Sequence, residues 1–217
     1  MTQGYTPRVG PTAMTAVLQR IFLLSPANTS AKRGQLLFNE PSQFDLARRL
    51  RREGALLGEI FTFISGLYFR GKLAYAQAFA SPPDNVPGVL VMTTSRGLLT
   101  PDTVLTLGEL LEMSRVPIEE ADSRYREPLC RDARALASRV GPDCKIVLLG
   151  SIASTKYVAP LLEIFGTQLL FPGEFVGRGD MSRGGLLLRC VQERMELQYA
   201  SVASAELRGA RPPKLPR

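Results

Sequence analysis

Three short apolar runs, each followed by a polar loop, constrain the fold of this chain more than any other feature. They span residues 20–25, 88–94 and 145–151. None of them alternates apolar with polar residues, and such runs are typical of strands that are buried on both faces. Helical segments separate one run from the next, which is the arrangement that builds parallel sheets. The sequence therefore predicts an α/β fold with a mainly parallel central sheet flanked by helices.

Five helices are expected between and after these strands. A capping box of Thr106 and Glu109 opens one over 107–113, because each side chain can satisfy a free backbone N–H group of the other. Asp122 can cap a second helix that runs to about Val140. The other three expected helices span 44–52, 67–79 and 157–165.

The C-terminal part predicts a different element and a single domain. Residues 186–192 and 196–202 flank a polar turn, which is typical of an antiparallel hairpin at a sheet edge. A chain of 217 residues can form one full domain. We expect a flexible lead-in over 1–16, one α/β domain over 17–203 and a basic, disordered tail over 204–217.

The apolar and cysteine content indicates a cytoplasmic protein without membrane contact. The N-terminus lacks a basic region followed by an apolar stretch and a cleavage site, so no signal peptide is expected. The apolar stretch 55–69 is interrupted by Glu59 and is too short to span a bilayer. Cys130, Cys144 and Cys190 are isolated, so neither a disulfide framework nor a thiolate zinc site is expected. Such cysteine usage fits a reducing compartment.

The charge balance favours anionic partners. The chain has 27 Lys and Arg against 20 Asp and Glu, which gives a net charge of +7. A positive field attracts nucleic acid, nucleotides and anionic lipid. The alternative is a basic surface without a partner. The chain contains no histidine, so histidine-based catalytic triads and histidine-ligated metals are excluded. We expect no metal and no cofactor, and any acid–base step must use carboxylates, Lys, Tyr or Cys.

The loop after the first strand resembles an anion cradle. Hydroxyls, an amide and two cations stand beside an expected helix start, where backbone N–H groups favour phosphate. The candidates are Ser25, Asn28, Thr29, Lys32 and Arg33. The alternative is a capped turn whose cations face water.

The loops after the second and third strands add further candidates. Gly97 allows a sharp turn that aims Ser95 and Arg96 at a ligand, and Asp102 is the carboxylate best suited as a base or water-orienting group. Lys156 in the third loop can reach a phosphate. The alternatives are simple turn chemistry in the second loop and helix capping in the third.

The segment 171–185 carries five glycines around two arginines. Glycines bring the backbone close to a ligand, and Arg is suited to bidentate contact with phosphate. This pattern favours Arg178 and Arg183 as phosphate-binding residues, with Asp180 as a second candidate for orienting water or a leaving group. Aromatic and basic residues also alternate over 68–75, where helical spacing favours a place in the core over base stacking.

Taken in order, these loops resemble the YaaA-like family, which is associated with peroxide stress and DNA binding and belongs to the uracil-DNA-glycosylase-like superfamily. The matching segments are 24–29, 95–102, Lys156 with Tyr157, and the Arg-Gly-x-Met-x-Arg string over 178–183. The family's lysine in the first loop is Asn28 here. The superfamily's glycosylases commonly use a histidine, so base excision by that route is not expected. The resemblance implies DNA binding linked to DNA damage, oxidative stress or base modification.

Three hypotheses for the function follow. The first is a nucleic-acid-binding protein, with DNA favoured over RNA, whose loop residues converge in one positively charged cleft at the carboxyl edge of the sheet. The second is an enzyme without histidine that acts on a nucleotide or a modified nucleobase through Asp102 or Asp180. The third is a scaffolding protein that uses the apolar stretch 56–68 as its interface.

Overall fold

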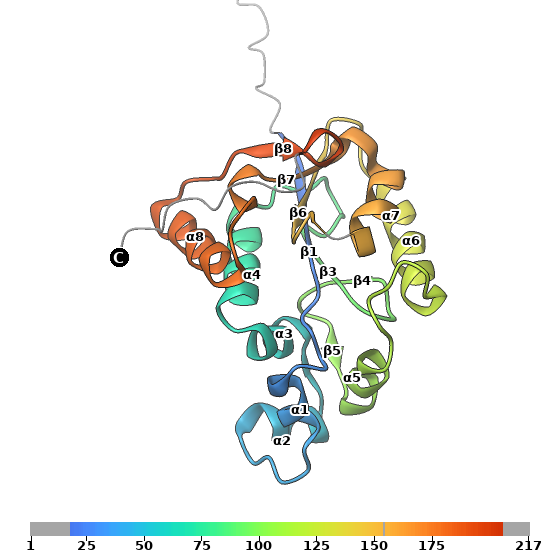
Figure 1. Ribbon diagram of the computed structural model, residues 1–217, viewed down its shortest axis with the longest axis vertical. Helices are drawn as coiled ribbons and strands as arrows, with labels where there is room; N and C mark the ends of the chain where they lie inside the picture. Colours follow the sequence, from blue (N-terminus) through green and yellow to red (C-terminus); the bar gives the residue numbers. More distant parts are fainter. Residues whose placement is uncertain (1–17, 154, 206–217) are drawn as a thin grey trace, which may run out of the picture.

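The computed structural model describes residues 18–153 and 155–205 (Figure 1). A six-stranded sheet forms its centre, in the order β4-β3-β1-β6-β7-β8. The strands β1, β3, β6 and β7 run parallel, while β4 and β8 are antiparallel to their neighbours. This confirms the predicted α/β class. The strands are β1 Arg20–Leu24, β3 Val89–Met92, β4 Leu98–Leu99, β6 Lys145–Leu149, β7 Leu169–Pro172 and β8 Tyr199–Ser201.

A second, smaller sheet lies beside α3 (Leu57–Ser65). It pairs β2 (Ala55–Leu56) with β5 (Val104–Leu105) in antiparallel register. Leu57 and Gly58 at the start of α3 donate backbone hydrogen bonds to Thr103 and Pro101, which fixes this sheet to the helix.

Helices cover both faces of the central sheet (Figure 1). Successive strand residues point to opposite faces, so Phe22 and Leu24 of β1 pack in one core and Ile21 and Leu23 in the other. The first core is covered by α1 (Lys32–Phe38), α2 (Asp45–Arg52), α3, α4 (Leu67–Phe79), α5 (Leu107–Ser114) and α8 (Asp180–Glu193). The second core is covered by α6 (Ser123–Ala137) and α7 (Thr155–Phe165). Short 3-10 turns span η1 Gly166–Gln168, η2 Gly173–Phe175 and η3 Val202–Ser204.

The predicted helix starts are confirmed by their caps. The Thr106 side chain accepts from Glu109 N, and the Glu109 carboxylate accepts from Thr106 N at 2.7 Å, which completes the capping box. The Asp122 side chain caps α6 by accepting from Arg124 N at 3.0 Å. The helix α4 coincides with the predicted range 67–79.

The predicted antiparallel pair at the C-terminus exists, but it is formed by β7 and β8. The prediction that 186–192 is a strand is wrong, because these residues lie in α8. Gly184, Leu187 and Cys190 recur every three residues and are buried, which is the spacing of a helix face. This face packs on α4 so closely that a Cβ at Gly184 would lie 2.7 Å from the backbone oxygen of Leu67.

The apolar stretch proposed as an interface is part of the core. Leu57, Ile60 and Phe61 of α3 are fully buried in the first core cluster. Most of this stretch is therefore buried, while Leu56 at its start is 41% exposed. All three cysteines lie among the described residues, where they are buried and unpaired.

Across 18–153 and 155–205, no helix combines the length and the apolar character that crossing a membrane requires. The predicted lead-in over 1–16 lies outside the described residues, as does the predicted tail from residue 206 onward.

Candidate functional site

The carboxyl ends of β1 and β6 are where the topology places a ligand site. Along the chain, β1 is followed by β3 on one side of it and then by β6 on the other. The strand order therefore reverses between β1 and β6. Ligands of open α/β sheets bind at the carboxyl ends of the strands at such a switch point. The loops that follow these two strands form the rim of the sheet at this edge.

Lys72 of α4 lies below this rim and is 1% exposed. Its Nζ donates to the main-chain oxygen of Ser25 at 2.6 Å and to Ser25 Oγ at 2.9 Å. The same Nζ lies 4.7 Å from the ring centre of Tyr68 and 4.8 Å from that of Phe69. The amine of α4 is thus held directly at the end of β1.

The pKa of Lys72 is lowered to about 7, chiefly by burial; the carboxylate of Asp180 opposes this shift, and the guanidinium of Arg183 adds to it. Desolvation disfavours the charged form of an amine, because a buried ammonium group loses the water molecules that stabilise its charge. A large fraction of this amine is therefore neutral near neutral pH. Lysines with this property are common at functional sites.

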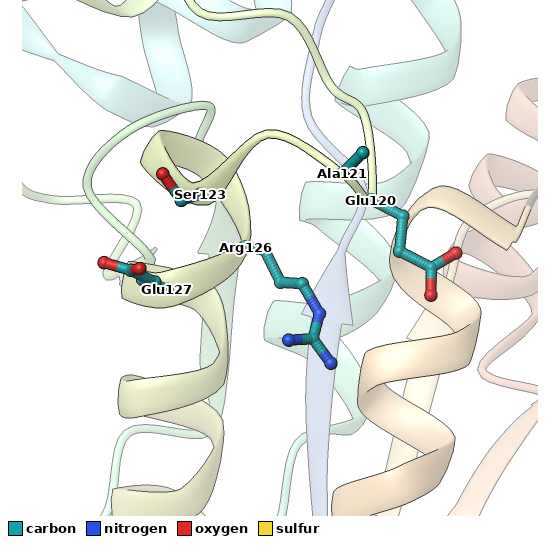
Figure 2. Close-up of a pocket in the computed structure, with 5 residues that line it drawn as sticks. All are labelled: Glu120, Ala121, Ser123, Arg126 and Glu127. Atoms are coloured by element: carbon teal, nitrogen blue, oxygen red, sulfur yellow. The ribbon is translucent and has the colours of Figure 1, made fainter.

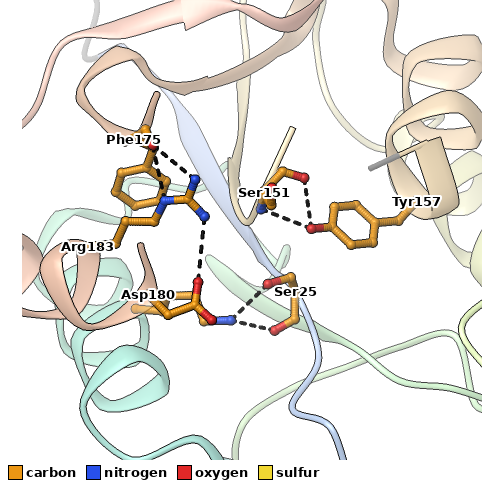
Figure 3. Close-up of polar contacts among 7 residues, drawn as sticks. Ser25, Ser151, Tyr157, Phe175, Asp180 and Arg183 are labelled. Carbon is orange, nitrogen blue, oxygen red and sulfur yellow. Dashed lines mark hydrogen bonds and ion pairs between the residues drawn. The ribbon is translucent and has the colours of Figure 1, made fainter. Parts of the chain in front are cut away.

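The start of α8 brings Arg183 and Asp180 to the same place. Arg183 donates through Nε and Nη2 to the main-chain oxygen of Phe175 at 3.2 and 3.0 Å, and its guanidinium lies 5.4 Å from the Phe175 ring centre. Its Nη1 lies 3.7 Å from Asp180 Oδ1, and only 12% of the Arg183 side chain is exposed. Figure 3 shows both side chains near Ser25. The structure therefore places Ser25, Asp180 and Arg183 together, as predicted.

Tyr157 completes the rim from α7. Its hydroxyl accepts from Ser151 N and donates to Ser151 O, both at 2.9 Å, so it holds the loop after β6 (Figure 3). Burial raises the pKa of Tyr157. A Cβ at Gly150 would lie 3.0 Å from Ser25 Cβ and 3.1 Å from the Tyr157 hydroxyl. The glycine therefore lets the ends of β1 and β6 pack against Tyr157.

Tyr68 contributes a buried hydroxyl without a partner. Its side chain is 8% exposed, and its oxygen forms no hydrogen bond with any described residue. Burial raises the pKa of Tyr68, so the group stays a neutral donor. A buried donor without an acceptor is costly, so this hydroxyl, which lies close to Arg183, is available to an acceptor atom of a ligand.

A cavity of about 370 Å³ opens on the other side of the loop after β1. The predicted residues Asn28, Thr29 and Lys156 line it together with Ser30, Thr94 and Arg115. Asn28 Oδ1 accepts from Ser30 N at 3.0 Å, which shapes the turn before α1. The loops after β1, β3 and β6 therefore converge here, as predicted.

Two other candidates lie apart from these groups. The guanidinium of Arg96 pairs with Glu109 Oε1 at 2.9 Å, so its charge is directed toward α5. This pairing also contributes to lowering the pKa of Glu109, whose largest cause is the backbone hydrogen bond from Thr106. Asp102 is exposed in the turn after β4 and takes part in no hydrogen bond or ion pair with the described residues.

The remaining candidates lie on the periphery. Lys32 and Arg33 are exposed on the first turn of α1, and Arg33 Nη1 lies close over Gly66. Arg178 donates to the main-chain oxygen of Glu174 at 2.9 Å and to Ser182 Oγ at 3.3 Å, which stabilises the turn before α8. Ser95 is half-buried in the loop after β3.

Another cavity, of about 540 Å³, lies at the start of α6 and is a poor match for an anion (Figure 2). Glu120 and Glu127 line it, and its one cation, Arg126, pairs with Glu163 of α7 at 3.4 Å. Two carboxylates repel a polyanion, so the carboxyl ends of β1 and β6 remain the candidate site.

Sequence analysis missed two residues that matter here, Lys72 and Arg115. Lys72 stands on the apolar face of its helix, four residues after Tyr68 and three before Tyr75, and this position was the signal that it is buried. Arg115 follows α5 and reaches the cavity only because the loop after α5 folds back onto the loop after β1.

Comparisons of this chain with protein-family models, with curated proteins and with solved structures found no match. The resemblance to the YaaA-like family therefore stays a prediction that rests on the quoted motifs.

Proposed function

We propose that the protein binds nucleic acid, DNA rather than RNA, at the carboxyl edge of the sheet. A backbone phosphate occupies the cavity lined by Asn28, Arg115 and Lys156, and the adjacent nucleotide faces Ser25 and Arg183 at the carboxyl ends of the strands.

The observation that carries this proposal is the pair of cations in a cavity rimmed by hydroxyls and an amide. Arg115 and Lys156 are exposed, and neither forms an ion pair with an acidic residue of the described chain. The guanidinium of Arg96, by contrast, pairs with the carboxylate of Glu109. Cations that are not neutralised within the protein attract phosphate most strongly.

The shape and overall charge agree with this assignment. A cavity of about 370 Å³ is within the size range of small-ligand sites. The net charge of +7 adds a long-range attraction for a polyanion. The resemblance to a family associated with DNA binding points in the same direction.

Fluorescence anisotropy with labelled duplex and single-stranded oligonucleotides tests the proposal. The double variant Lys156→Ala/Arg115→Ala is compared with Lys145→Ala/Arg139→Ala. Lys145 begins β6 and Arg139 follows α6, so the second pair removes the same charge at the opposite edge of the sheet. We expect the first variant to bind roughly tenfold or more weakly than the second, because each charge-assisted phosphate contact contributes about 1.5–3 kcal/mol.

Two results would contradict the proposal. One is wild-type protein that binds neither oligonucleotide at low salt. The other is an equal loss of affinity in both double variants, which would indicate attraction by net charge alone.

A further inference from the structure

We propose that Ser25 and Lys72 form a nucleophile and general base that cleave a phosphate diester. The proposal rests on the proposed function for its substrate, since the diester is the backbone linkage of the bound nucleic acid. It goes beyond the proposed binding function, because it assigns a catalytic activity to these two residues.

The proposed base, the amine of Lys72, lies within hydrogen-bond distance of the proposed nucleophile, the hydroxyl of Ser25. Lys72 Nζ lies 2.9 Å from Ser25 Oγ, and the 2.6 Å bond to the main-chain oxygen of Ser25 fixes the amine in this position. When the amine is neutral, the shorter bond still uses one of its N–H groups. Its lone pair can then accept the proton of Ser25 Oγ. This is the arrangement by which a serine is activated without histidine.

The protonation state of Lys72 suits a base. Its surroundings are two aromatic rings, the end of β1, the carboxylate of Asp180 and the guanidinium of Arg183, and its pKa is lowered to about 7, chiefly by burial. A general base is most effective when its pKa lies near the working pH. An exposed lysine would be fully charged and could not take a proton.

The groups around the dyad suit an anionic electrophile. Arg183 is 12% exposed and keeps its Nη1 at 3.7 Å from Asp180, too long for a hydrogen bond, so this group can turn to a phosphoryl oxygen. The Tyr68 hydroxyl, which has no partner among the described residues, belongs to the ring that Lys72 Nζ contacts. These two donors favour a charged phosphate ester over a neutral carboxylic ester.

The reaction balances in two steps. Ser25 Oγ attacks phosphorus while Lys72 takes the Oγ proton, and the bond from phosphorus to the leaving oxygen breaks as Lys72 returns that proton to it. In the second step Lys72 takes a proton from water, the hydroxide attacks phosphorus, and Ser25 Oγ leaves and regains its proton. No oxidant, reductant or further reactant is needed.

An alkyl fluorophosphonate probe tests the nucleophile on the full chain, with intact mass and peptide mapping as readouts. We expect a single adduct on Ser25, none in Ser25→Ala, and an unchanged adduct in Ser138→Ala, whose serine lies at the end of α6. Lys72→Met keeps a side chain of similar size without the amine, and it should slow labelling at least about 100-fold. An unlabelled, folded wild-type protein, or equal labelling of Lys72→Met, would overturn the proposal.

If Lys72→Met does not fold, the pH dependence of the labelling rate tests the same proposal on the wild-type protein. The labelling rate of the wild-type protein should rise between pH 6 and pH 8, because the neutral fraction of an amine with a pKa of about 7 rises over that range. A rate that does not change over this range would overturn the proposal.

The substrate class is tested with two chromogenic esters. We expect bis(p-nitrophenyl) phosphate to be hydrolysed by the wild-type protein and not by Ser25→Ala. Hydrolysis of p-nitrophenyl acetate alone would overturn the phosphate assignment. Labelling of Ser25 without oligonucleotide binding would contradict only the proposed function, while binding without labelling would contradict only the dyad.

Discussion

The Nζ atom of Lys72 lies 2.9 Å from the Oγ atom of Ser25, although 47 residues separate them along the chain. This contact joins the end of the first strand to α4, and Lys72 is only 1% exposed. The arrangement places an ionisable group at the carboxyl edge, where the sequence predicted a ligand site on other grounds. The predictions below follow from this arrangement and from the packing that supports it.

The buried amine should make stability depend on pH. The pKa of Lys72 is about 7 in the folded protein and near its ordinary 10.5 in the unfolded chain. Between these values the unfolded chain binds more protons, so the free energy of unfolding should rise with pH, by up to about 1.4 kcal/mol per unit. Below pH 7 the amine is charged in both states and contributes no slope.

Urea unfolding of the wild-type protein and Lys72→Met at pH 6.5, 7.5 and 8.5 measures this effect. The advantage of the variant over the wild type should be largest at pH 6.5 and should shrink as pH rises. Burial raises the pKa of Cys144 and Cys190 in the folded protein, so the stability that these neutral thiols contribute is lost only at higher pH. This loss is the same in the wild-type protein and in Lys72→Met. Parallel curves for the two proteins would show that Lys72 does not titrate in this window.

The two buried tyrosine hydroxyls without partners should respond differently to Phe. Tyr68 lies beside Lys72, while Tyr125 lies on α6 against the other face of the sheet. Either substitution removes an unsatisfied donor, so the free energy of unfolding should stay the same or rise by about 1–3 kcal/mol. Only Tyr68→Phe should slow labelling by the fluorophosphonate, by about tenfold or more. Equal labelling of both variants would remove Tyr68 from the site.

Adjacent glycines of α8 provide a test of the packing that positions Arg183. A Cβ at Gly184 would lie 2.7 Å from Leu67 O, whereas a Cβ at Gly185 would have nothing within 4 Å. Gly184→Ala should therefore destabilise the protein by about 1–3 kcal/mol through overpacking. Gly185→Ala should stabilise it by about 0.5–1 kcal/mol through helix propensity. Thermal unfolding compares them, and a stabilised Gly184→Ala would refute the close contact of α4 with α8.

Much of the fold could be predicted because local signals were strong. The three uninterrupted apolar runs gave the parallel strands, and Thr106 and Asp122 marked helix starts through their own side chains. The segment 186–192 was misassigned, because its Leu and Val residues suit either a strand or a helix. What decides between them is the contact of Gly184 with α4, a tertiary feature that no local pattern records.

The candidate site could be predicted only in part. Its place at the carboxyl edge follows from topology, and Asn28, Thr29 and Lys156 meet there as expected. The partners of individual charges depend on contacts between distant segments. Arg96 was expected to face a ligand but pairs with Glu109, and Lys72, which contacts Ser25, was not among the predicted site residues.

The central claim is that cations at the carboxyl edge of the sheet hold backbone phosphates. The salt dependence of DNA binding tests this claim most directly. The logarithm of the duplex binding constant is measured against the logarithm of salt concentration for the wild type and for both double variants. Each lost phosphate contact lowers the steepness of this line by about 0.9, so Lys156→Ala/Arg115→Ala should reduce it by about 1.8 relative to the wild type. The charge-matched Lys145→Ala/Arg139→Ala should leave it unchanged. Equal slopes in the wild type and in Lys156→Ala/Arg115→Ala would contradict the claim.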